Sequence, residues 1–149
     1  MNSQLMLIAL ALAAGIMIPF QSAVNAQLTK NLASPYYSTL IVFIVASLSV
    51  ATYILVTRQS VPSTSTFAHI PIHYFLGGVL GAFYILAIVS VAPKIGIGMV
   101  TMMVLLGQII AAMVIDHFGL LHAQVHKMSI LRLVGLLLMV GGIYLIKKF

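Results

Sequence analysis

Five long apolar stretches constrain this chain more than any other feature of its sequence. Each is close to the roughly 20 apolar residues that an α-helix needs to cross the hydrocarbon of a bilayer. They are solidly apolar rather than alternating, so they do not match the strands of a membrane β-barrel. We therefore expect an all-α integral membrane protein with five transmembrane helices. The predicted helices run from about Gln4 to Leu28, Tyr37 to Thr57, Ile72 to Val91, Ile95 to Ile115 and Ile130 to Ile146.

The composition excludes a protein that folds in water. The chain has 149 residues, of which 62% are hydrophobic and 5% charged, with a mean hydropathy of +1.21. An ordinary soluble domain carries about 25% charged residues, so this chain could not cover its surface with polar groups. The five stretches leave no room for a soluble domain, and we expect residues 1–149 to form one transmembrane domain. Cysteine is absent, which excludes disulfides and thiolate metal sites.

The first stretch contains Val24-Asn25-Ala26, which resembles a signal-peptidase site. No Lys or Arg precedes this site, and the apolar run of the stretch is too long for a signal core. We therefore expect the first stretch to remain in the protein.

The predicted connections between the helices are short. The longest connection holds a turn-forming run at residues 62–66. The four connections are Asn31–Tyr36, Arg58–Pro71, a tight turn at Pro93-Lys94, and His117–Ser129.

The seven basic residues are almost evenly divided between the two sides of the membrane. Orientation depends on the Lys and Arg bias near the membrane ends, and here one side holds three and the other four. A few juxtamembrane positions or the membrane insertase could still fix one orientation. Alternatively, copies of the chain insert in both orientations, and we favour this dual topology. Two opposite copies would pair as an antiparallel homodimer of ten helices. The basic residues are Arg58, Lys127 and Arg132 on one side, and Lys30, Lys94, Lys147 and Lys148 on the other.

Two amides in the first stretch are candidates for binding a solute. Gln21 and Asn25 are four residues apart, on one helix face, and Pro19 precedes them. Proline removes a backbone donor and frees a carbonyl. Gln21 would lie about 10 Å inside the end of the helix at Leu28. The alternative is that both amides are interfacial and contact headgroups.

A third amide lies in the fourth stretch. Gln108 follows Gly107 and lies eight residues before Asp116, about 12 Å from that end of the helix. A hydrogen bond between helices explains an amide at this depth as well as a solute contact does. In an antiparallel dimer, Gln21 of one copy would come to nearly the depth of Gln108 of the other, so we expect shared polar clusters.

Asp116 is the only acidic residue. It could serve as a proton or cation site, but Arg132 lies on the same side of the membrane. An unpaired charge there would be costly, so we expect a structural ion pair between the two. No span carries a central carboxylate, so a central acid that exchanges protons for a cationic drug is absent.

Small residues at helical spacing predict close helix packing. Gly77 and Gly81, with Gly78 between them, lie in the third stretch, Gly107 in the fourth and Gly15 in the first. Such pairs let helix backbones approach each other.

The sequence carries no signal for a cofactor, a metal or catalysis. The five histidines are loosely spaced, so we expect no metal site. There is no nucleotide-binding glycine loop, and no catalytic set can be assembled around one acid, so we expect no enzyme. The basic residues suit lipid headgroups and form no basic face, so we expect no nucleic-acid partner.

Several motifs occur in a fixed order along the chain: Ala14-Gly15 followed by Pro19, Gln21 and Asn25; Gly77-Gly78-x-x-Gly81-Ala82; Ala92-Pro93-Lys94-Ile95-Gly96; Gly107-Gln108; Asp116-His117-Phe118-Gly119; and Arg132-Leu133-x-Gly135. Together they resemble the YdcZ-like group of small inner-membrane proteins in the drug/metabolite transporter superfamily. The resemblance implies a bacterial inner-membrane protein whose five-helix unit equals half of a ten-helix transporter. It also implies that single-unit members work as antiparallel pairs; group members are generally called exporters, of poorly defined substrate.

The function that we expect is secondary transport by an antiparallel homodimer. Uncharged polar walls favour a small neutral, amphiphilic or zwitterionic metabolite or drug. The alternative is a non-transporting membrane component, such as a lipid-binding or accessory subunit. The expected partners are membrane lipid, an oppositely inserted copy and an unknown small solute. The expected substrate-binding residues are Gly15, Pro19, Gln21, Asn25 and Gln108.

Overall fold

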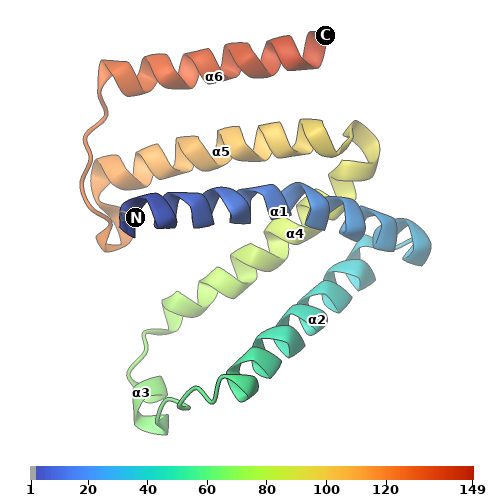
Figure 1. The fold of residues 1–149 in the computed structure, drawn as a ribbon, viewed down its shortest axis with the longest axis vertical. Helices are drawn as coiled ribbons and strands as arrows, with labels where there is room; N and C mark the ends of the chain where they lie inside the picture. Colours follow the sequence, from blue (N-terminus) through green and yellow to red (C-terminus); the bar gives the residue numbers. More distant parts are fainter. Residues whose placement is uncertain (1–2) are drawn as a thin grey trace. The chain divides into compact units, whose positions relative to one another are not determined.

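The computed structural model describes residues 3–149, which are almost entirely helical (Figure 1). Among these residues, five helices are long and apolar enough to cross a membrane: Ser3–Leu32, Pro35–Val56, Ile72–Ile95, Ile97–Phe118 and Ile130–Lys148. The all-α prediction with five spans is therefore confirmed. The elements are α1 (Ser3–Leu32), α2 (Pro35–Val56), α3 (Thr64–Ala68), η1 (Ile72–Phe75), α4 (Leu76–Ile95), α5 (Ile97–Phe118), η2 (Leu120–His122) and α6 (Ile130–Lys148).

The described residues form two compact units, one that ends at Lys94 and one that comprises Ile95–Phe149. The first contains α1 to α4, and the second contains α5, η2 and α6. That residues 1–149 act as one transmembrane domain stays a prediction.

A tight connection joins α1 to α2 in the first unit. Ala33 takes a positive φ of 48°, and Ser34 then caps α2 by accepting a hydrogen bond from the Tyr37 N–H. Serine is a favoured N-cap, and a proline such as Pro35 suits the first turn, where its missing N–H costs nothing. The two helices are in contact near this connection and diverge away from it, as Figure 1 shows.

The buried residues of the first unit are unusually polar. They lie in the second half of α1, at the start of α2 and in the second half of α4. By contrast, residues 3–17 of α1 are exposed throughout. In lipid the outer surface is apolar, so hydroxyl and amide groups gain by lying between helices. The buried residues are Ser22, Asn25, Ala26, Thr29, Ser38, Thr39, Ile88, Val89 and Ala92.

The predicted tight turn at Pro93-Lys94 is wrong. Helix α4 continues through Pro93 to Ile95, and Gly96 makes the turn with a φ of 87°. Proline fixes a φ that is compatible with a helix and removes only one backbone hydrogen bond. Glycine is the residue that adopts a positive φ without strain, so the break between α4 and α5 lies there.

Other predicted boundaries were too short. Helix α1 continues to Leu32 rather than Leu28, and α5 continues to Phe118, so His117 belongs to a helix and not to a connection. The predicted turn-forming run at 62–66 contains the start of the short helix α3, which Ser63 caps by accepting from the Thr66 N–H. Caps of this kind act locally and can start a helix within a polar segment.

The connection between α5 and α6 in the second unit is closely folded. Gly119 ends α5 with a φ of 60°, and its N–H donates to the Ile115 carbonyl. A Cβ at Gly119 would lie 2.7 Å from Val125 Cγ2, so only glycine fits this turn. Ser129 then caps α6 by accepting from the Arg132 N–H.

Candidate functional site

An open cavity of about 600 Å³ lies along one face of α1. Its lining residues recur at the spacing of one helix face, over about two turns. Two amides, a phenyl ring, a thioether and an isopropyl group contribute to it. The lining residues are Met17, Phe20, Gln21, Val24 and Asn25.

Asn25 is the most constrained of these residues. It is only 7% exposed, and its backbone carbonyl accepts hydrogen bonds from Thr29 Oγ1 at 2.9 Å and from Ser38 Oγ at 3.4 Å. No hydrogen bond found within residues 3–149 involves the side-chain amide of Asn25. Its amide atoms are not fully buried, because no buried side-chain nitrogen or oxygen of the described residues lacks a hydrogen-bond partner. They are therefore accessible for binding to a solute or to another chain.

Gln21 lies one turn before Asn25 and is exposed. Pro19 stays inside α1, so the Gly15 carbonyl has no N–H four residues later to accept from. No atom lies within 4 Å of the position of a Cβ on Gly15. The structure therefore brings Gln21 and Asn25 to one cavity, and the Gly15 carbonyl one turn before Pro19 lacks its usual helical donor.

Gln108 lies in the other unit, on α5, and its side chain is exposed. Neighbouring Gly107 has no atom within 4 Å of a Cβ position. That Gln108 completes a shared cluster with Gln21 and Asn25 stays a prediction.

The glycines predicted to pack helices make few contacts within the chain. Gly81 alone among them has a neighbour, Phe43 Cζ, at 3.9 Å from a Cβ position. Gly77, Gly78 and Gly107 have nothing within 4 Å in the described structure. Close helix packing at these three stays a prediction.

A second, smaller groove of about 240 Å³ lies between α2 and α4. Its walls are mostly apolar, and Tyr36 and Thr39 supply the hydroxyl groups. The lining residues are Tyr36, Thr39, Val79, Ala82, Phe83 and Leu86.

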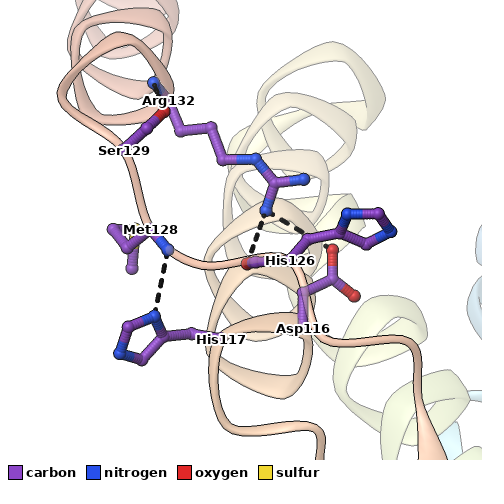
Figure 2. Close-up of polar contacts among 6 residues, drawn as sticks. All are labelled: Asp116, His117, His126, Met128, Ser129 and Arg132. Carbon is purple, nitrogen blue, oxygen red and sulfur yellow. Dashed lines mark hydrogen bonds and ion pairs between the residues drawn. The ribbon is translucent and has the colours of Figure 1, made fainter.

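The connection between α5 and α6 places Arg132 beside Asp116. Arg132 Nη1 lies 3.6 Å from Asp116 Oδ2, and the same nitrogen donates to the His126 carbonyl at 3.2 Å (Figure 2). The side chains are 37% and 35% exposed, so water screens the pair. Sequence reasoning paired these two residues but did not anticipate the contact with His126.

The same connection also folds back on the end of α5. The His126 N–H donates to the Asp116 carbonyl at 2.9 Å, and the Met128 N–H donates to His117 Nδ1 at 3.0 Å. Sequence reasoning missed these bonds because helical periodicity does not predict contacts between residues that lie ten or eleven positions apart across a connection. The only local signals for the fold of this connection were Gly119, which ends α5, and Ser129, which starts α6.

Residues 3–149 contain no group of three His, Cys, Asp or Glu side chains that could hold a metal.

Comparison with known proteins places the chain in a family. The model of the family described as "Putative inner membrane exporter, YdcZ" matches residues 6–145. The chain belongs to this family. The match covers the motifs that carried the resemblance, which is therefore confirmed. Together with its five spans, membership makes this a multi-pass inner-membrane protein. No curated protein and no solved structure matches the chain.

Proposed function

We propose that the protein is a secondary transporter that exports a small neutral, amphiphilic or zwitterionic metabolite or drug. The observation that carries this proposal is the side-chain amide of Asn25, which has no hydrogen-bond partner in the described chain, is not fully buried and borders the α1 cavity. Membership of a family described as exporters supports it.

The chemistry of the α1 cavity suggests the class of solute. Its walls carry amide, aromatic, thioether and aliphatic groups but no charge. Amides both donate and accept hydrogen bonds, so they bind a polar group of either kind. A strong cation would require a carboxylate in a site of low dielectric constant, and none lines this cavity.

We propose that the working unit is an antiparallel homodimer. Residues 3–17 of α1 are exposed, and Gly15 and Gly107 have no close neighbours, so these surfaces are free to accept a second copy. The three-to-four division of basic residues favours insertion in both orientations.

The depths of the amides also suit an inverted pair. Gln21 lies about 16 Å from the end of α1 at Leu32, and Gln108 about 15 Å from the end of α5 at Phe118. Both amides therefore lie near the middle of a hydrocarbon core of about 30 Å, so inversion of one copy keeps its Gln21 level with the other copy's Gln108.

A lipid-binding or accessory subunit is the alternative. The apolar groove between α2 and α4, with a volume of about 240 Å³, favours it because an acyl chain needs no polar partners there. Such a protein would bind amphiphiles without moving any solute across the membrane.

The test combines ligand stabilisation with flux. The detergent-purified protein is heated with neutral, zwitterionic and cationic amphiphiles of similar size, because a true ligand raises stability by mass action. Flux of each stabilising compound is then measured in liposomes that contain only this protein. We expect flux of a neutral or zwitterionic compound. Stabilisation without flux for every compound would favour the lipid-binding alternative.

A matched pair of variants locates the site. Gln21→Leu should reduce flux at least about tenfold, since a lost hydrogen bond to solute is worth about 1.4 kcal/mol. Gln27→Leu changes an exposed amide of the same helix that does not line the cavity and should leave flux unchanged. Equal effects of the two variants would show that the cavity is not the site.

A further inference from the structure

The hydrogen bond between Met128 and His117 defines the protonation state of one imidazole. The Met128 N–H donates to His117 Nδ1 at 3.0 Å. A nitrogen that accepts a hydrogen bond carries no proton, and both nitrogens of a histidinium are donors. The contact therefore exists only while the His117 ring is neutral, with its proton on Nε2.

We call the contacts among Asp116, His117, His126, Met128 and Arg132 the α5–α6 clasp (Figure 2). Three of them do not depend on His117: the bond from His126 N–H to the Asp116 carbonyl, the bond from Arg132 to the His126 carbonyl, and the ion pair between Arg132 and Asp116. Loss of the His117 contact would consequently leave the connection attached at His126. It would release Met128, which directly precedes Ser129, the N-cap of α6.

We propose that the clasp is a proton-binding site that ties the start of α6 to the end of α5. In the closed form, neutral His117 accepts from the Met128 N–H. A proton from water adds to the Nδ1 lone pair, the ring gains one positive charge, and the N–H···N bond breaks. The Met128 N–H then bonds to water, and the start of α6 is held to α5 by the contacts at His126 and by the Arg132–Asp116 pair.

Histidine is suited to this role because its charge changes between about pH 5 and 8. In the second unit, Asp116 precedes His117 on α5 and attracts a positive charge, whereas Arg132 on α6 already pairs with Asp116 and repels one. The remaining ionisable residues of this region are His122 in η2, and His126 and Lys127 in the connection. The proposal does not depend on transport, because its test measures the clasp itself.

The test is NMR on the full chain in lipid nanodiscs, with ¹⁵N-labelled histidine and amide hydrogen exchange. At pH 8 we expect the Nε2–H tautomer of His117 and a protected Met128 amide. When the ¹⁵N signals report a protonated His117 ring, protection of that amide should fall about tenfold after correction for intrinsic exchange, the factor for loss of one hydrogen bond. The Nδ1–H tautomer at pH 8, or protection that is unchanged while His117 titrates, would overturn the proposal.

Three variants distinguish the loss of the hydrogen-bond acceptor at His117 from the gain of a positive charge on its ring. His117→Asn places an amide oxygen near the position of Nδ1 and cannot titrate, so Met128 should stay protected at both pH values. His117→Ala has no acceptor and should lose protection at both. His126→Asn is the matched control, because only the backbone of His126 takes part in the clasp. A wild-type pH response in His117→Asn, or its loss in His126→Asn, would contradict the proposal.

Discussion

Arg132 on α6 and Asp116 on α5 lie 3.6 Å apart, from Nη1 to Oδ2, and the same Nη1 also donates to the His126 carbonyl. About one third of each side chain is exposed. Exposed pairs contribute only about 0.2–1 kcal/mol because water screens them. The arginine therefore acts chiefly by its geometry: one side chain joins α5, the connection and the start of α6.

The first prediction follows from this double contact. Asp116→Asn should lower the free energy of unfolding by less than about 1 kcal/mol, since a screened pair is lost. Arg132→Met should lower it further, because the bond to the His126 carbonyl is also lost. Chemical unfolding in detergent micelles measures both. If Asp116→Asn left stability intact but abolished a pH dependence of transport, Asp116 would belong to ion coupling instead.

The second prediction concerns the bond between α1 and α2. Ser38 is fully buried, and its hydroxyl donates to the Asn25 carbonyl. Ser38→Ala should lower the free energy of unfolding by about 1 kcal/mol, the usual net value of one hydrogen bond. Ser49→Ala is the control: this exposed serine of α2 bonds only to the Val45 carbonyl of its own helix. Thermal unfolding should show a loss for Ser38→Ala alone, and equal shifts would contradict it.

The third prediction concerns the end of α5. Gly119→Ala adds a Cβ 2.7 Å from Val125 Cγ2 at a φ of 60°. The strain should lower the free energy of unfolding by more than about 1 kcal/mol. Gly98 lies in the same helix with open space around it, so Gly98→Ala should be neutral or raise stability by up to about 1 kcal/mol. Denaturant midpoints distinguish the two, and a stable Gly119→Ala variant would show that the connection has another conformation.

The fourth prediction is dual topology. Because the basic residues divide three to four, a C-terminal tag should be accessible from both faces of the membrane. Adding two lysines to one side should shift nearly all copies to one orientation. A single orientation of the unmodified protein in its native membrane would exclude an antiparallel homodimer.

The fifth prediction concerns the shared amide cluster. The chain has no cysteine, so Gln21→Cys and Gln108→Cys can be introduced into two differently tagged copies without background. An antiparallel dimer should yield a disulfide between the two tags on mild oxidation. Gln27→Cys with Gln108→Cys is the control and should cross-link weakly. Equal yields from both pairs would contradict a cluster of Gln21 and Gln108.

The sequence was informative about helices and less so about their ends. All five spans were predicted, but the turn after α4 was placed at Pro93 and lies at Gly96. Proline reads as a helix breaker in a sequence, yet near the end of a helix it removes a single hydrogen bond. The surrounding chain decides whether the helix tolerates that loss.

The candidate site was partly predictable. The four-residue spacing of Gln21 and Asn25 predicted one face, and both line the α1 cavity. Their burial differs, however: Gln21 is exposed, whereas Asn25 is 7% exposed. Periodicity gives the direction of a side chain from its own helix, but burial depends on the neighbouring helix.

The sequence by itself determined that this is a five-span membrane protein of the YdcZ family. In lipid, every backbone group must be satisfied within its own segment, so an apolar run of sufficient length implies a helix wherever it lies. Only the tertiary structure decided that Ser38 reaches the Asn25 carbonyl and that Met128 donates to His117. Such bonds join segments whose approach depends on helix packing and on the path of a connection, which no local pattern encodes.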